Sequence, residues 1–142
     1  MPDQTIYPLF VYGSLMSGFK SPAYEYISRF FNLLGKGKVK GRLYDMGEYP
    51  AAIPSGEDVF IQGESYLIKN ESEFSWAIGQ LDDYEGIIPE PGEAPLYRRE
   101  LTSVIMDDKT ITAWIYWYNG SIAGKPHIAS GDVLLWRANK ES

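Results

Sequence analysis

The sequence predicts an α+β domain built around a mainly antiparallel, barrel-like sheet. Several short runs of apolar, β-branched and aromatic residues are typical of strands, whereas two longer segments show helical periodicity. Few neighbouring strands are joined through a helix, which disfavours a parallel sheet. The 142 residues, 44% of them hydrophobic, suffice for one core, so we expect a single domain over residues 1–142.

The N-terminal part is predicted to hold a strand followed by a helix. Ile6–Tyr12 is a compact apolar and aromatic run that stops at Gly13, which is typical of a buried strand. Ser21 can cap a helix that has Pro22 at its first position, and Gly35 is expected to end that helix. The expected apolar face of the helix consists of Tyr24, Ile27, Phe30, Phe31 and Leu34.

Basic residues occupy every second position of the next predicted strand. The expected buried positions are Val39, Gly41 and Leu43, and the basic positions are Lys36, Lys38, Lys40 and Arg42. This period of two favours a solvated strand face over an anion-binding site, although both interpretations stay open. A glycine- and proline-containing loop, Asp45–Asp58, and a third strand, Val59–Lys69, are predicted to follow.

The segment Asn70–Gly86 has the strongest helical pattern and places a carboxylate in line with its apolar stripe. Asn70 suits the N-cap, Glu73 completes a capping box, and Gly86 suits the C′ position. Glu85 continues the stripe inward, where burial would raise the pKa of its carboxyl toward that of a general base. A glutamate in the last turn can also lean out to solvent, and the pattern allows both orientations. The stripe itself consists of Phe74, Ala77, Ile78 and Leu81.

A proline-rich loop and a long hairpin are predicted after this helix. Ile87–Pro95 holds three prolines in nine residues, so it cannot form regular structure. Strands are expected over Leu96–Met106 and Thr110–Tyr118, joined by a turn at Asp107–Lys109. Both faces of the second strand are largely apolar or aromatic, which places it centrally in the sheet. One face carries Thr112, Trp114, Tyr116 and Tyr118, and the other carries Ile111, Ala113, Ile115 and Trp117.

The composition excludes several classes of protein. A formal net charge of -6 disfavours binding to nucleic acid or to anionic lipid. No apolar run approaches the roughly 20 residues of a membrane span, and the N-terminus lacks a signal-peptide pattern. We therefore expect a cytoplasmic protein with neither membrane nor nucleic-acid partners. The absence of cysteine removes disulfides and thiolate chemistry.

A hydrolytic triad and a metal centre are also disfavoured. His127 is the only histidine, and it lies in a turn-rich stretch where nothing indicates a base oriented toward Ser14. A metal site would depend on carboxylates, and the adjacent Asp82 and Asp83 cannot face one ion from the same side of a helix. A glycine-rich phosphate loop is not present either. We expect no metal and no cofactor.

The turn after the first strand is a candidate for anion binding. Gly13 and Ser14 directly follow the buried strand, and glycine allows backbone N–H groups to face an anion or a developing oxyanion. A Tyr-Gly-Ser turn is also common as an ordinary change of chain direction, so both interpretations stay open.

Five short motifs follow one another along nearly the whole chain. They are FVYGSL (residues 10–15), RLYDMGEYPAA (42–52), LDDYEG (81–86), YRRE (97–100) and AWIYWY (113–118). In this order and spacing they resemble the γ-glutamylcyclotransferase-like superfamily, above all its small bacterial members and its γ-glutamylamine cyclotransferase branch. The resemblance implies a small mixed β-barrel flanked by helices. It implies Glu85 as general acid/base, and a substrate site formed by Tyr12, Gly13, Ser14, Leu15, Tyr97 and Tyr116.

The implied reaction is an intramolecular acyl transfer on a small γ-glutamyl substrate. The α-amine of the substrate attacks its own γ-carbonyl, which closes 5-oxoproline and releases an amine without a protein nucleophile. Leu15 stands where the glutathione-pathway enzymes have Asn, and the loop after Glu85 is long, so the leaving amine stays open, as does the oligomeric state. A small-molecule binding domain of the same fold, or an enzyme acting on another acyl substrate, is the rival hypothesis.

Overall fold

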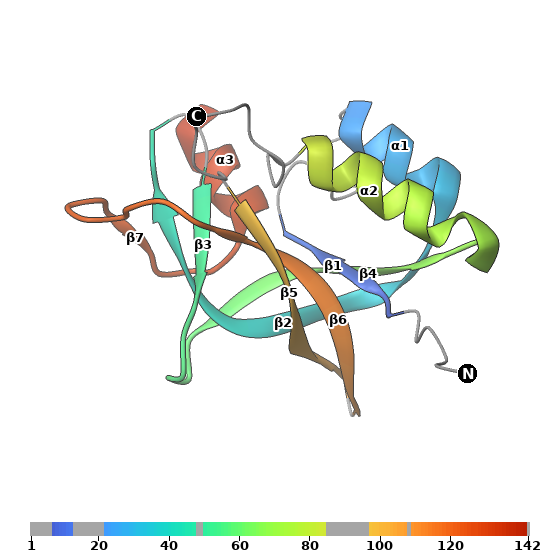
Figure 1. The fold of residues 1–142 in the computed structure, drawn as a ribbon. Helices are drawn as coiled ribbons and strands as arrows, with labels where there is room; N and C mark the ends of the chain where they lie inside the picture. The colour runs from blue at the N-terminus through green and yellow to red at the C-terminus, as the bar shows by residue number, and fades with distance from the viewer. Residues whose placement is uncertain (1–6, 13–21, 48–49, 85–96, 108, 142) are drawn as a thin grey trace.

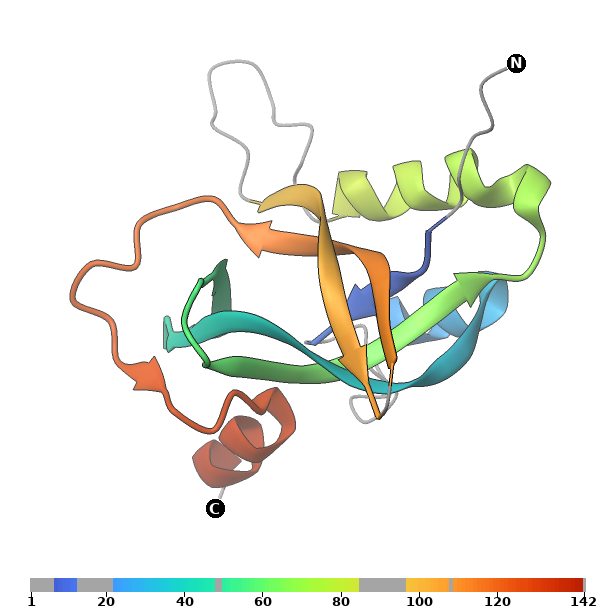
Figure 2. The ribbon, with the colours of Figure 1, turned by 90° about the horizontal axis from the view of Figure 1, so that it is seen from below.

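The structure is a computed structural model that describes residues 7–12, 22–47, 50–84, 97–107 and 109–141. Its elements are β1 (Leu9–Val11), α1 (Pro22–Phe30), β2 (Phe31–Asp45), β3 (Pro50–Pro54), β4 (Phe60–Ile68), η2 (Glu71–Glu73), α2 (Phe74–Tyr84), β5 (Tyr97–Met106), β6 (Lys109–Tyr118), β7 (His127–Ile128) and α3 (Val133–Glu141). Figures 1 and 2 show a curved sheet with α1 and α2 together beside β1 and β4, and α3 next to β7. The predicted α+β class is confirmed.

Five of the described strands close into a barrel. The order across the sheet is β2-β4-β1-β6-β5, and β5 pairs back onto β2 through Lys38 and Ile105. These pairs are antiparallel except for β1 with β6, which run parallel and meet at Leu9 and Trp114. The short strands β3 and β7 pair with the far end of β2. The barrel is therefore mixed and mainly antiparallel, as expected.

Glycines on β2 and β4 make room for large rings inside the barrel. A Cβ atom on Gly41 would lie 3.1 Å from a ring carbon of Trp117. A Cβ atom on Gly63 would lie 2.5 Å from Phe10 Cζ and would also collide with the carbonyl oxygen of Val11. Trp117 and Phe10 are the largest fully buried side chains. The two rings fill the interior because the facing backbone carries no side chain at these glycines.

A second apolar layer lies between the sheet and the helices α1 and α2 (Figure 1). Ala77, Ile78 and Leu81 of α2 are buried in the same hydrophobic cluster as Ile27 of α1. The hydroxyl group of Tyr26 donates to the carbonyl of Ala77 over 3.1 Å and joins the two helices. The buried part of the predicted α2 stripe is thus confirmed.

The chain enters α2 through the predicted cap. Asn70 is extended, with φ -125° and ψ 110°, and its side-chain oxygen accepts from the backbone N–H of Ser72 at 3.1 Å. One 3₁₀ turn, η2, then leads into the α-helix. Gly86 lies outside the described residues, so its place at the helix end remains a prediction.

The predicted end of the first helix is wrong. The helix α1 ends at Phe30, and β2 begins directly at Phe31 and continues for 15 residues. Phe31 and Leu34 fit a helical stripe, but the pairing of β2 with β4 decides in favour of a strand. Gly35 does not stop a helix. It has φ 151° and lies at a register shift, where a β-bulge bends the strand.

The other predicted strands are confirmed close to their expected bounds, and three elements were missed. In the β5–β6 hairpin, Met106 pairs with Lys109 across the turn, where Asp107 has φ 47°. The strand β3 lies inside the predicted loop Asp45–Asp58, and neither β7 nor α3 was predicted. Of the helices that the structure describes, none combines the length and the apolar character needed to span a membrane.

The basic positions of β2 confirm the solvated-face interpretation. Lys40 and Arg42 form ion pairs with acidic residues of the β3–β4 connection, at 3.4 Å to Asp58 and 3.0 Å to Glu57. The ammonium of Lys38 lies 4.4 Å from the centre of an aromatic ring, that of Phe60. These contacts are typical of a charged sheet surface.

The glycines allow a paired test of barrel packing. Gly63→Ala should lower the free energy of unfolding by about 1–3 kcal/mol, because its methyl group would overlap Phe10 and the Val11 carbonyl. Gly79→Ala is the matched control: it lies inside α2 with nothing within 4 Å of its Cβ position, so helix propensity should raise stability by about 0.5–1 kcal/mol. Urea unfolding measures both. Equal effects of the same sign would contradict the packing argument.

Candidate functional site

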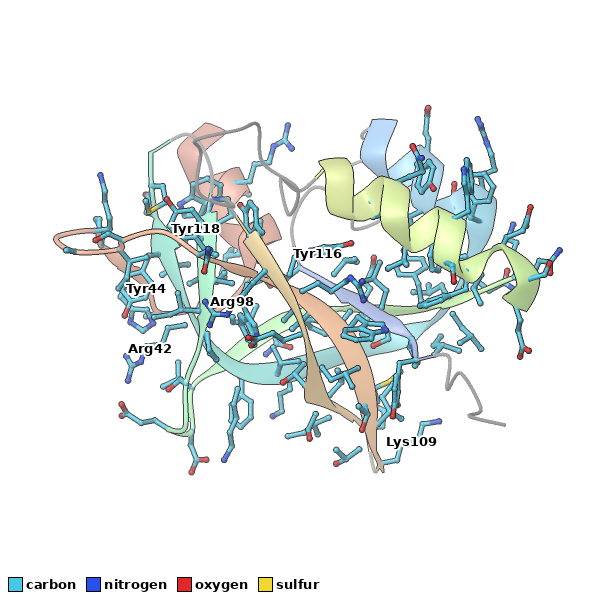
Figure 3. The ribbon with its side chains drawn as sticks, in the orientation of Figure 1. Arg42, Tyr44, Arg98, Lys109, Tyr116 and Tyr118 are labelled. Atoms are coloured by element: carbon cyan, nitrogen blue, oxygen red, sulfur yellow. The ribbon has the colours of Figure 1, made fainter. Side chains whose placement is uncertain are left out.

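The outer face of the β5–β6 hairpin gathers the tyrosines singled out from the sequence. Because side chains alternate along a strand, Tyr116 shares a face with Trp114 and Tyr118 on β6. Across the hairpin, Tyr97 pairs with Tyr118, and Arg99 pairs with Tyr116. The side chains of Tyr116 and Tyr118 are buried, and those of Tyr97 and Arg99 are half-buried. Figure 3 shows Tyr116 and Tyr118 along β6, with Tyr118 nearer to α3.

A tyrosine hydrogen bond ties the end of β1 to β6. Tyr12, which directly follows β1, donates its hydroxyl proton to the backbone carbonyl of Tyr116. Both side chains are buried. At the other end of β1, the backbone N–H of Trp114 donates to the carbonyl of Pro8 at 2.8 Å. Tyr12, the last described residue before the Gly13–Leu15 turn, is thus fixed beside Tyr116.

Aromatic and cationic groups alternate along this face. The rings of Tyr97 and Tyr118 meet edge to face, with 5.7 Å between their centroids. Beyond Tyr116, the guanidinium of Arg99 lies 4.3 Å from the centre of the Trp114 ring. A planar cation stacked on an indole beside tyrosines is an arrangement suited to a small anionic ligand.

A buried carboxylate lies on the same face of the sheet. Glu64 of β4 pairs with Val11 of β1, and its Oε1 accepts from the hydroxyl of Tyr66 at 3.0 Å. This charge-assisted bond offsets part of the cost of burying the carboxylate. Leu9 is level with Trp114 on the parallel strand, so Val11 is level with Tyr116. A single row across four strands therefore consists of Glu64, Val11, Tyr116 and Arg99.

The structure brings together the predicted site residues that it describes. Tyr12 and Tyr116 are in direct contact, and Tyr97 lies on the same hairpin face as Tyr116. Tyr12 gives its hydroxyl proton to the protein, which makes it a link between strands. The remaining predicted site residues, Gly13, Ser14, Leu15 and Glu85, lie outside the described residues, so the backbone anion site and the inward orientation of Glu85 remain predictions.

Three residues of this face were missed by the sequence interpretation: Arg99, Trp114 and Glu64. The signal for the first two was available, because each is two positions from a predicted pocket tyrosine on the same strand. Glu64 was harder to find. It is a lone acid in an otherwise apolar strand, and its burial depends on the pairing with β1.

His127 lies away from this face. It is exposed on β7, pairs with Tyr44 of β2, and its ring centre is 5.5 Å from that of Tyr44. A triad base is held by a buried acid in a shielded site. The exposed position of His127 therefore supports the view that it is not a catalytic base.

The chain matches a known family over most of its length. Residues 9–138 match the family described as Gamma-glutamyl cyclotransferase, AIG2-like. No curated protein matches the chain.

Several solved structures have the same fold. YkqA from Bacillus subtilis has a TM-score of 0.71 at 22% identity; the match covers 96% of this chain, which spans 43% of YkqA. The protein ytfP from Escherichia coli has a TM-score of 0.59 at 29% identity, over 89% of this chain and 96% of ytfP. An aig2-like protein (ggact) from Mus musculus has a TM-score of 0.63 at 21% identity, over 87% and 86% of the two chains.

The Tyr12 hydrogen bond is testable by removing one atom. Tyr12→Phe should lower the free energy of unfolding by about 1–2 kcal/mol, because a buried bond is lost. Tyr26→Phe removes a bond of the same kind from the helix pair, at a partly exposed position, and should cost less. Urea unfolding measures the stability, and the carbonyl carbon shift of Tyr116 reports the bond itself. An unchanged shift in Tyr12→Phe would contradict the proposed link.

Proposed function

The chain belongs to the Gamma-glutamyl cyclotransferase, AIG2-like family, and we propose that it converts a γ-glutamyl amine or amide into 5-oxoproline and a free amine. The observation that carries the proposal is the Tyr12–Tyr116 contact. It fixes the end of the first motif, FVYGSL, beside the face that carries Tyr97 and Tyr116. Three of the motif tyrosines thus come from distant parts of the chain to one place.

The proposed reaction forms one C–N bond and breaks another. The α-amine of the substrate attacks the γ-carbonyl carbon, and the bond from that carbon to the departing nitrogen then breaks. The attacking ammonium must lose a proton, and the departing nitrogen must gain one. Because the nucleophile is part of the substrate, the protein supplies orientation and proton transfer, without a nucleophile of its own.

Glu85 is the proposed carrier of that proton. The helix α2 buries Ala77, Ile78 and Leu81 and ends at Tyr84, immediately before Glu85 in the chain. Glu85 is four positions after Leu81, so a continued helical path would direct it toward the same buried side. A carboxylate there takes the proton from the attacking ammonium and delivers it to the departing nitrogen.

Backbone N–H groups of Gly13–Leu15 are the proposed donors to the oxyanion. A glycine turn directly after a buried strand can present such donors without obstruction by side chains. Donors that are fixed before the reaction commonly contribute several kcal/mol to the stability of the transition state. The fixed position of Tyr12 supports this role, because it anchors the residue before the turn.

The first test is product formation. The purified chain should release 5-oxoproline from at least one member of a panel of γ-glutamyl amines and amides that includes γ-glutamyl-ε-lysine. Mass spectrometry detects the product, and a parallel incubation without protein corrects for spontaneous cyclisation. No 5-oxoproline from any member, with the protein folded, would favour the non-catalytic binding domain or another acyl substrate.

The second test concerns the base. Glu85→Gln keeps the size of the side chain and removes proton transfer, so turnover should fall about 100-fold or more, while binding of 5-oxoproline persists. Glu73→Gln is the matched control on the exposed start of the same helix and should leave turnover unchanged. His127→Ala should also have little effect. Full activity of Glu85→Gln would remove the base assignment, and inactivity of His127→Ala would favour a triad.

A further inference from the structure

Arg99 is the charged residue closest in register to the proposed site. It is the cross-strand partner of Tyr116, whose carbonyl accepts the Tyr12 hydrogen bond. Directly opposed residues of an antiparallel pair have Cβ atoms about 5 Å apart. Its half-buried guanidinium then runs along the hairpin and stacks over Trp114. Arg99 therefore places a positive charge on the same face as Tyr97 and Tyr116.

The stacking directs what this guanidinium can bind. An indole occupies the flat face of the group, whereas the N–H donors of a guanidinium point outward in its plane, in a fork that matches a carboxylate. A second donor lies at the same place. Among the residues that the structure describes, none accepts from the indole N–H of Trp114, whose nitrogen is buried. Both donors favour an anionic acceptor.

The substrate of the proposed reaction carries such an acceptor. A γ-glutamyl group has its α-carboxylate on the same carbon as the attacking α-amine, so a residue that holds the carboxylate also orients the amine. The chain has a net charge of -6, which disfavours an anion unless a local cation receives it. Arg98, the neighbouring arginine, lies on the opposite face of β5 and is paired with Glu100 at 3.0 Å.

We propose that Arg99, stacked on Trp114, binds the α-carboxylate of the substrate and thereby selects γ-glutamyl groups with a free carboxylate. The proposal rests on the proposed cyclotransferase function and adds a specificity-determining residue to it. The ion pair forms in a site lined by aromatic rings, where screening by water is weaker than at the surface. The alternative is that Arg99 acts on the fold alone, by holding Trp114 in place.

The experiment compares two substrates that differ at one group. One is the best γ-glutamyl amine from the product screen, and the other is its α-carboxamide, which keeps the amine and loses the negative charge. The wild-type chain should prefer the free acid. Arg99→Gln should lower kcat/KM on the free acid by roughly 10- to 100-fold, the usual effect of one charge-assisted hydrogen bond, and leave the carboxamide nearly unchanged. Arg99→Lys should keep part of the preference.

Arg98→Gln is the matched control, because it removes the adjacent arginine without touching Trp114 and should keep the preference. Equal losses on both substrates in Arg99→Gln would overturn the proposal and show a purely structural role. If that variant does not fold, a wild-type chain that turns over both substrates equally well would overturn it too. A wild-type chain that forms no 5-oxoproline at all would instead reject the cyclotransferase function, and with it this inference.

Discussion

The long strand β2 is the element on which the barrel depends, because it pairs with both ends of the five-stranded array. Over its 15 residues it contacts β4 along most of its length and β5 at one point, and its far end holds β3 and β7. A flat strand could not do this. The bulge at Gly35 bends it, and Gly37 lets Val104 of β5 approach, since a Cβ atom there would lie 2.8 Å from Val104 Cγ1.

The candidate site follows from this closure. Closing the sheet makes β1 and β6 neighbours in parallel register, which sets Glu64, Tyr116 and Arg99 in one row on the outer face. Opposite charges thus lie at the two ends of an aromatic strip. A zwitterionic head group, with an ammonium and a carboxylate on one carbon, has the same polarity. The sheet therefore supplies recognition, whereas the segments after β1 and α2 are proposed to supply the chemistry.

Local signals predicted the parts of the fold that are locally determined. Asn70 caps its helix because its own side chain bonds two residues ahead, which a sequence shows directly. Phe31 and Leu34 were misassigned because their spacing fits both periods, and the pairing with Ile68 and the rest of β4 is not local information. The strand β3 was missed because prolines bound it at Pro50 and Pro54, which disfavours a central strand but is tolerated where it pairs only with β2 among the described strands.

The site was predictable to the same degree. Alternation placed Tyr116 and Tyr118 on one face, and the structure agrees. The contact of Tyr12 with Tyr116 joins positions separated by 104 residues, which no periodicity encodes. That separation also bears on how the chain is made. Contacts so distant in sequence form slowly, and β1 is synthesised long before β6. On a nascent chain β1 can pair with β4 first, so the edge that bears the site is completed late, when the hairpin of β5 and β6 arrives.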